Sequence, residues 1–398
     1  MVSRLLKVIP LGIGAFAMAA AAALLMANLI LPALHRGGIK ISKSLIGVTA
    51  PAKPRLTWQG LLNGTFQAAY ASEIGTKMPL YADAVRLRDQ AELSLFGVSA
   101  TASVVVGQGT ALFEAAYAEE YCARSIAAWR PGAERWAIRL REIQDIEMRR
   151  GRAFLYVLTP SKVSHDPAIL PPGYTCPASQ ADRAGTVPVW LGLLRDAGVH
   201  VVDTTAVMRE AEGAYPFRMF PRGGSHWNAV GAALSEQAVL AGLNDVAPGR
   251  GFEPFTFQWH MQKHPTGVDI DIANLMNLIR PFRYDPVPAT EIQPAVGVTC
   301  PGTKVVIIGG SFSHAMLEHL SRGSCEHGAI EYEYWRAYTV RWSADMVVAQ
   351  RGVDEAARDA AILAADVLVY EENEQVMPNP LHGAALYEFM HDRVSATP

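Results

Sequence analysis

The sequence predicts an α/β protein built on a parallel sheet with helices on both faces. Short apolar segments with the character of buried strands alternate along the chain with longer segments of helical periodicity. The strand segments are nearly continuous apolar runs, as in RAFLYVLTP and KVVIIGG, which is typical of strands covered on both faces. With 398 residues, half of them hydrophobic, the chain can form one large domain or two smaller ones.

The N-terminal segment, residues 1–37, differs from the rest and is predicted to be a signal anchor. The run from Val8 to Leu34 is apolar except for Asn28 and follows two basic residues. A bilayer-spanning helix needs ~20 apolar residues, whereas the apolar part of a cleaved signal peptide has only ~7–15. We therefore expect one uncleaved transmembrane helix in the inner membrane, with the rest of the chain in the periplasm. Cleavage stays open, because the segment is rich in alanine.

The later elements follow in a regular order. Residues 38–100 are expected to form a linker and a helical entry region, and residues 101–398 a single α/β domain. A strand, glycine turn and strand at 101–114 open that domain. Helices are expected at 133–150, 187–198, 228–243 and 313–322, strands at 152–160, 199–208 and 304–310, and a helix followed by a buried strand at 356–374.

Ligands of such a sheet bind at the carboxyl ends of its strands, which gives a filter for functional residues. Polar residues directly follow a predicted strand at four places: Thr159–Lys162, Asp203–Thr204, Gly310–Ser311 and Glu371–Glu374. We interpret the glutamate-rich segment as a solvated strand end. The other three are candidates for a site.

Ser311 is the candidate nucleophile. It follows Gly309 and Gly310 and precedes a helix, so the glycines allow a tight turn and the first helical amides can donate to an oxyanion. By itself the segment is equally compatible with a serine that only caps the helix. A nucleophilic serine needs a base, and the best candidate is His226, which lies in the Gly-rich segment PRGGSHWNAVGA before another helix.

Charge and cysteine content exclude some classes of function. The net charge is −3 and no basic stripe is visible, so a nucleic-acid partner is not expected. The chain has no CxxC pair, and His260 and His264 lack the glutamate of a helical zinc motif, so no metal or other cofactor is expected. Four cysteines in an exported protein permit two disulfides in three connectivities. A Cys300–Cys325 bridge would bracket Ser311, but the sequence does not choose among them.

The serine and histidine segments together resemble a known family. GGSFS and GGSHWNAVGA are similar to the nucleophile and histidine blocks of the SGNH-hydrolase-like alginate O-acetylation proteins, which are exported polysaccharide O-acetyltransferases. The resemblance covers most of the chain beyond the anchor. It includes the segments LFGVSATASVVVGQGTALFE, YVLTPSK, GVHVVDTT, VDIDIANLMNL and ADVLVYEENE, in that order. The histidine precedes the serine, whereas in ordinary SGNH esterases and α/β-hydrolases the serine comes first.

The resemblance implies an SGNH-like catalytic domain with a defined reaction. Ser311 would take an acetyl group from a donor, and His226 would act first as the base for the serine and then as the base for a sugar hydroxyl. The Ser311 amide and neighbouring backbone or side-chain donors, Gly310 among them, would hold the oxyanion. Trp227 and Asn228 are candidate substrate-binding residues, and Lys162 and Arg222 would either bind a polysaccharide carboxylate or support the site. The implied acceptor is an exopolysaccharide of the alginate or cellulose type. A membrane-bound O-acyltransferase partner would deliver the acetyl group.

One position departs from the family pattern. The family commonly carries an aspartate two residues before the histidine, and here that position is Gly224. Another carboxylate can replace it, with Asp203, Asp269 and Asp271 as the candidates, and the small side chains around Gly224 leave room for one. Alternatively, a backbone carbonyl orients His226, or the protein is a weakly catalytic or non-catalytic polysaccharide-binding subunit. An SGNH-type acetyl esterase also stays open, because esterase and transferase share the acyl-serine step.

Overall fold

The computed structural model describes the protein at residues 19, 23, 26, 44–48, 53, 55–78, 80–280, 282–322, 325, 327–342, 347–377 and 383–394. The predicted membrane anchor therefore lies almost entirely outside the described residues. Among the residues that are described, no helix is both long enough and apolar enough to cross a membrane.

The chain divides into two compact units. The first comprises residues 1–102 and 273–282. Its described part contains helices α2 (Trp58–Leu62), α3 (Thr65–Lys77) and α4 (Tyr81–Phe96). Within this unit the side chain of Asn277 bonds both the amide and the carbonyl of Ile46, at 2.8 and 3.0 Å. The second unit, residues 103–272 and 283–398, holds the sheet and the candidate site.

The main sheet of the second unit has seven strands in the order β10-β9-β8-β7-β11-β3-β4. Its strands are β3 (Ala153–Thr159), β4 (Val201–Asp203), β7 (Lys304–Gly309), β8 (Gly328–Glu333), β9 (Tyr338–Trp342), β10 (Val347–Arg351) and β11 (Val367–Asn373). The strands from β8 to β4 pair in parallel, but β9 and β10 are antiparallel. The prediction of a wholly parallel sheet was wrong at this edge. A parallel connection needs a crossover of a dozen or more residues, and the short segment between β8 and β9 permits only a hairpin.

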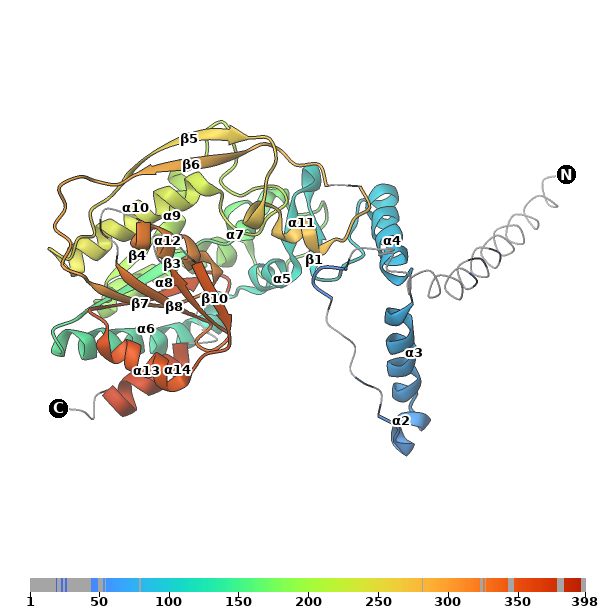
Figure 1. Ribbon diagram of the computed structural model, residues 1–398, viewed down its shortest axis with the longest axis horizontal. Helices are drawn as coiled ribbons and strands as arrows, with labels where there is room; N and C mark the ends of the chain where they lie inside the picture. The colour runs from blue at the N-terminus through green and yellow to red at the C-terminus, as the bar shows by residue number, and fades with distance from the viewer. Residues whose placement is uncertain are drawn as a thin grey trace, which may run out of the picture. The chain divides into compact units, whose positions relative to one another are not determined.

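Helices cover both faces of this sheet, as the sequence predicts (Figure 1). On one face α6 (Ile126–Arg149), α8 (Gln180–Ala197), α13 (Glu355–Ala364) and α14 (Gly383–Phe389) pack on Phe154, Tyr156 and Tyr370. On the other, α10 (Ala229–Val246) and α12 (His314–Arg322) pack on Leu155, Val157 and Ile307. Because side chains alternate along a strand, the unbroken apolar runs supply both cores at once.

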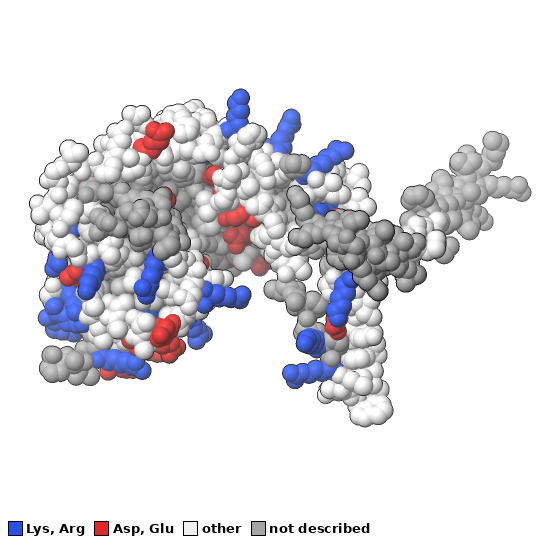
Figure 2. Space-filling view, viewed as in Figure 1, with Lys and Arg blue, Asp and Glu red and all other residues white. Residues whose placement is uncertain are grey.

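Smaller elements surround the sheet. They are β1 (Val104–Val106), β2 (Leu112–Glu114), α5 (Ala115–Ala123), α7 (Lys162–His165), α9 (Thr204–Ala211), β5 (Thr256–Gln262), α11 (Asp271–Leu275) and β6 (Val287–Gln293). Strands β5 and β6 form an antiparallel pair, and β6 lies against α10 (Figure 1). The face drawn in Figure 2 carries both acidic and basic side chains.

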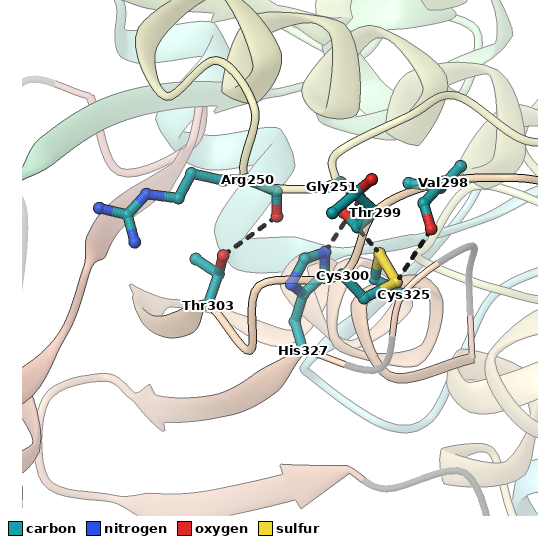
Figure 3. Close-up of a disulfide and its surroundings, with 8 residues drawn as sticks. All are labelled: Arg250, Gly251, Val298, Thr299, Cys300, Thr303, Cys325 and His327. Atoms are coloured by element: carbon teal, nitrogen blue, oxygen red, sulfur yellow. Dashed lines mark hydrogen bonds between the residues drawn. A yellow bond between two sulfur atoms is a disulfide. The ribbon is translucent and has the colours of Figure 1, made fainter.

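Two disulfides connect the four cysteines, Cys122 with Cys176 and Cys300 with Cys325. The second bridge joins the segment before β7 to the segment after α12 (Figure 3). Beside it the Thr303 hydroxyl donates to the Arg250 carbonyl at 3.0 Å, and a ring nitrogen of His327 lies 3.2 Å from the Gly251 carbonyl. The strand and helix that flank Ser311 are thus fastened at their far ends.

Candidate active site

The turn that carries Ser311 is held by close packing. A side chain at Gly309 would collide with Ser313 and Glu371, because a Cβ atom there would lie 2.8 and 2.9 Å from their oxygens. Gly310 donates its amide to the Glu371 carboxylate at 2.7 Å, and the Ser313 hydroxyl returns to the Gly310 carbonyl at 2.6 Å. The two glycines are required by close approach rather than by a left-handed backbone, since Gly310 has φ −111°. These contacts therefore fix the turn that carries Ser311.

His226 joins this serine to a carboxylate. Its Nε2 atom lies 2.7 Å from Ser311 Oγ, and its Nδ1 atom lies 2.7 Å from Asp271 Oδ2. With the Nδ1 proton on the carboxylate side, Nε2 is free to accept the serine proton, which is the arrangement of a Ser-His-Asp triad. The imidazole also packs on the Phe312 ring at 4.7 Å between centroids.

The carboxylate of Asp271 is fixed by further bonds. Its Oδ1 atom accepts from the Ser225 amide at 2.8 Å and from the Ile272 amide at 2.7 Å. The Ser225 hydroxyl in turn donates to Glu114 at 2.6 Å. Two amides and one imidazole thus leave the Asp271 side chain little freedom. The histidine loop and the acid-bearing segment hold each other in place.

Gly224 explains how the acid comes from another segment. A Cβ atom at this position would lie 2.3 Å from the Val268 carbonyl oxygen and 2.9 Å from that of Asp269. The segment Gly267–Ile270 therefore occupies the space in which a side chain at position 224 would lie. The absence of a side chain at Gly224 is what allows Asp271 to reach His226. The room that the sequence analysis expected there is filled by backbone.

Lys162 is hydrogen-bonded to the backbone of the histidine loop and is not among the residues that line the cavity. Its ammonium donates to the carbonyls of Pro221, Arg222 and Gly224 at 2.5, 3.1 and 2.8 Å. The side chain is buried, and burial lowers the pKa of Lys162 to about 7. Three carbonyl oxygens match the three donors of the ammonium form. Of the two roles expected for Lys162, these contacts agree with support of the site and not with substrate binding.

Four other predicted site residues are occupied by structural contacts. Gly310 has given its amide to Glu371, so that amide cannot hold an oxyanion. Arg222 pairs with Asp285 at 2.8 Å. Trp227 is buried with its ring 5.0 Å from that of Phe312.

Asn228 caps α10 by accepting from the Gly231 amide at 2.8 Å. Trp227 and Asn228 still form part of the cavity wall.

The three aspartates that could orient His226 make different contacts. Asp203 caps α9 through the amides of Thr205 and Ala206, at 2.9 and 3.2 Å, and no bond joins it to His226. Asp269 lines the cavity, where burial raises its pKa to about 6. Of the three candidates, Asp271 is the one bonded to the histidine.

The interpretation of Glu371–Glu374 as a solvated strand end was wrong. Glu371 and Glu372 are fully buried and Glu374 is nearly so. Glu371 bonds the Gly310 amide and the Thr159 hydroxyl, and Glu372 accepts from Tyr156 at 2.6 Å. Glu374 pairs with the buried Arg124 at 3.3 Å. The strand lies in the middle of the sheet, so both faces of its carboxyl end are covered, and each carboxylate has a buried partner.

Tyr334 was not among the site residues predicted from the sequence. Its hydroxyl is hydrogen-bonded to both the amide and the side chain of Ser311, and its own amide donates to the Gly309 carbonyl at 2.9 Å. Burial, with Glu333 and Glu371 nearby, raises the pKa of Tyr334 to about 12, so the hydroxyl stays protonated. Tyr334 and Trp335 have φ of 49° and 64°, in the left-handed region that favours glycine. No glycine or asparagine in this segment signals that turn, so the sequence gives no cue.

A cavity of about 600 Å³ opens beside the triad. Its wall includes His226 and Ser311, the α12 residues His314 and Glu318, and Thr290 and Ile292 from β6. Across the described residues, no group of three or more histidine, cysteine, aspartate or glutamate side chains is arranged to hold a metal ion. The chemistry that the visible groups can perform is nucleophilic acyl transfer at Ser311.

Comparison with known proteins agrees with this fold. The family model for the SGNH hydrolase-like domain of the acetyltransferase AlgX matches residues 104–323, more than half of the chain. No curated protein matches the sequence. Among solved structures, the O-acetyltransferase domain of Pseudomonas putida AlgJ is 19% identical, covers 73% of this chain and 99% of its own, and has a TM-score of 0.46.

Two further solved structures are similar in the same way. Pseudomonas aeruginosa AlgX is 15% identical, with 78% of this chain and 71% of that chain covered and a TM-score of 0.47. Bacillus cereus PatB1 is 11% identical, with 63% and 92% covered and a TM-score of 0.40. The family match spans β1, the histidine loop and the serine turn. It decides to which family the chain belongs. The chain belongs to the family of SGNH hydrolase-like acetyltransferases that is typified by AlgX.

Proposed function

We propose that this protein is an exported O-acetyltransferase that acetylates an exopolysaccharide through an acetyl-serine intermediate. The observation that carries the proposal is the unbroken relay from Asp271 through His226 to Ser311, with 2.7 Å at each step, on the wall of a large cavity. Membership in an acetyltransferase family supports acetyl as the group that is transferred. The relay speaks against a non-catalytic binding subunit.

The geometry supports a two-step mechanism. His226 Nε2 takes the proton of Ser311 as Oγ attacks the acetyl carbonyl of the donor, and the same proton passes to the leaving oxygen. Asp271 stabilises the imidazolium that forms between these events. In the second step a sugar hydroxyl attacks the acetyl-serine, gives its proton to His226, and Ser311 leaves with that proton. Atoms and charge balance without a cofactor.

The oxyanion of each tetrahedral intermediate is assigned to the Ser311 amide and the Tyr334 hydroxyl. In the resting structure this amide donates to the tyrosine oxygen, so the oxyanion takes the place of that oxygen as the acceptor. Tyr334 is 38% exposed and can turn, whereas the Gly310 amide is held by the fully buried Glu371. The raised pKa keeps the tyrosine hydroxyl protonated, so it can also donate to the oxyanion. The left-handed backbone at Tyr334 is a strained feature of the kind that collects at functional sites.

We place the catalytic unit in the periplasm, held by the predicted N-terminal anchor. A membrane-bound O-acyltransferase would then supply the acetyl donor at the outer face of that membrane. These statements rest on the apolar run from Val8 to Leu34 and on the family resemblance.

The test is direct detection of the intermediate. The purified full-length chain is mixed with a chromogenic acetyl ester, and the mass of each protein is measured together with release of the chromophore. Wild-type protein should gain one acetyl group at Ser311, and Ser311→Ala and His226→Ala should gain none. Ser313→Ala is the matched control in the same turn, and it should keep the label even if its turnover is lower. Equal turnover in wild type, Ser311→Ala and His226→Ala would refute the proposal.

A further inference from the structure

The cavity is much larger than the group that is transferred. An acetyl group is only a methyl and a carbonyl, whereas the cavity of about 600 Å³ falls in the range of sites that bury ligands of ~300–1,000 Å³. Ser311 and His226 lie on its wall, so the rest of the volume is available to the acceptor. The residues around that volume therefore report the chemistry of the acceptor.

The charge of the cavity is acidic. Asp269 and Glu318 line it, and no lysine or arginine does so among the described residues. The nearby bases are engaged elsewhere, since Lys162 is buried under the histidine loop and Arg222 is paired with Asp285. Besides His226, the basic side chain on the wall is that of His314, which lies 3.2 Å from Glu333, a carboxylate that balances its charge when it is protonated. A chain of uronate sugars would meet like charge here, and such contacts exclude a partner strongly.

Aromatic residues of β5 lie opposite the β6 residues of the cavity wall. In the β5–β6 pair, Phe257 is opposite Ile292 and Trp259 is opposite Thr290. Both β6 residues line the cavity. Opposite residues of an antiparallel pair project from the same face, with Cβ atoms roughly 4.5–5.5 Å apart. Trp259 is therefore on the face of the pair that continues the cavity wall.

Two rings hold Trp259 in position. Phe217 and Tyr215 meet it edge to face at 5.1 and 6.1 Å, and they stack on each other at 5.5 Å. Despite these contacts Trp259 keeps 38% of its surface exposed. Tyr215 and Phe217 also pack on the buried cluster that contains Trp227 and Phe312, the residue after the serine. Aromatic contacts thus run from Phe312, the residue after the serine, through Tyr215 and Phe217 to the partly exposed indole of Trp259.

We propose that Trp259, supported by Tyr215 and Phe217, is a subsite for the acceptor and that the acceptor is a neutral polysaccharide rather than a polyuronate. The apolar C–H face of a neutral sugar ring packs on an indole by dispersion and burial of apolar surface. Its hydroxyls face the carboxylates of Asp269 and Glu318, which accept hydrogen bonds. This inference rests on the proposed acetyl transfer and adds the class of its acceptor.

The experiment compares two acceptors of equal length. The full-length chain, with a chromogenic acetyl ester as donor, is offered a β-1,4-glucan hexasaccharide or a mannuronate hexasaccharide, and acetylated sugar is measured by mass spectrometry. We expect kcat/KM for the glucan to exceed that for the mannuronate by at least about tenfold, because the cavity is acidic. Glu318→Lys should raise acetylation of the mannuronate severalfold. A preference for the mannuronate in the wild type, or acetylated Ser311 with no transfer to the glucan, would overturn the neutral acceptor.

Variants on one strand test the subsite. Trp259→Ala should raise the KM for the glucan by about tenfold, because the apolar face of the sugar ring loses the aromatic surface on which it packs. Trp259→Phe should recover part of this loss. His260→Ala is the matched control, since His260 is the next residue and projects from the opposite face of the pair. Equal KM values in Trp259→Ala and His260→Ala would overturn the subsite. Failure of the wild type to form acetyl-serine would instead refute the proposed function, so the two failures are distinguishable.

Discussion

The proposed nucleophile and the proposed acid of the triad reach the site in different ways. Ser311 lies on a strand–turn–helix unit whose parts are consecutive in the sequence. The two glycines before it let the turn pack closely against the buried Glu371. Asp271 comes from a separate segment, 45 residues after His226, that fits only because Gly224 has no side chain. The first arrangement is local and the second is tertiary. An acid that is moved to another segment can keep its distance to the histidine, provided that the backbone makes room.

The largest expected effect is on the acid itself. Asp271→Asn should lower the rate of acetyl-serine formation by about 10⁴-fold, because the amide stabilises neither the correct tautomer nor the imidazolium. Stopped-flow measurement of chromophore release gives this rate. Asp203→Asn is the control, because Asp203 caps α9 and is not bonded to His226, and because asparagine caps a helix about as well as aspartate, so the rate should be unchanged. An Asp271→Asn protein with the wild-type rate would mean that His226 is oriented by another group.

Tyr334 tests whether the serine turn supplies all the oxyanion donors. Tyr334→Phe should lower kcat by about 10²–10³-fold, because one preorganised donor is removed while the ring and the backbone remain. The variant should still melt at the wild-type temperature. Tyr338→Phe, four residues along on β9, should leave kcat unchanged. If the two variants have the same kcat, the Ser311 amide would need a different second donor.

Gly224 tests the tertiary half of the comparison. Gly224→Ala places a methyl group 2.3 Å from the Val268 carbonyl, so the segment that carries Asp271 must move. A displacement of ~1 Å in a catalytic group can cost about 10²-fold in rate, and we expect a loss of that size together with a lower melting temperature. Gly192→Ala, in helix α8 with open space around it, should show neither. Unchanged activity in Gly224→Ala would show that the acid-bearing segment adapts.

The smallest effect on activity is expected at Glu372, which lies on the other side of its strand from the site. Burial raises the pKa of Glu372 to about 8, well above its value in an unfolded chain. The folded state then binds more protons than the unfolded state between pH ~4.5 and ~8, so this contribution to stability is present at low pH and is lost as the pH rises. Melting temperatures measured from pH 5 to 8 should fall less in Glu372→Gln than in the wild type. An identical slope in both would mean that Glu372 is ionised throughout.

The serine and histidine segments of the site were predictable because each is a pattern of consecutive residues. A Gly-Gly-Ser after an apolar run and a histidine in a Gly-rich loop before a helix both stand out by their local patterns. The family and the alternation of strands and helices followed from the same signals. The antiparallel edge at β9 and β10 was missed, because its hairpin has no glycine or asparagine turn signal. The roles of Lys162 and Arg222 stayed open between substrate binding and support, because a cation that satisfies internal carbonyls or pairs with a carboxylate looks the same in sequence as one that binds substrate.

The sequence by itself determined the class of fold, the serine, the histidine and the empty place at Gly224. It could not decide which aspartate serves the histidine, because Asp203, Asp269 and Asp271 are alike in type and differ only in where the chain carries them. Tertiary structure decided that choice by filling the space at Gly224 with the segment before Asp271. It also brought Tyr334 to the serine and placed Trp259 opposite Thr290 of the cavity wall, through strand pairings that join residues distant in sequence. Contacts of that kind depend on backbone shape, which no local pattern of side chains encodes.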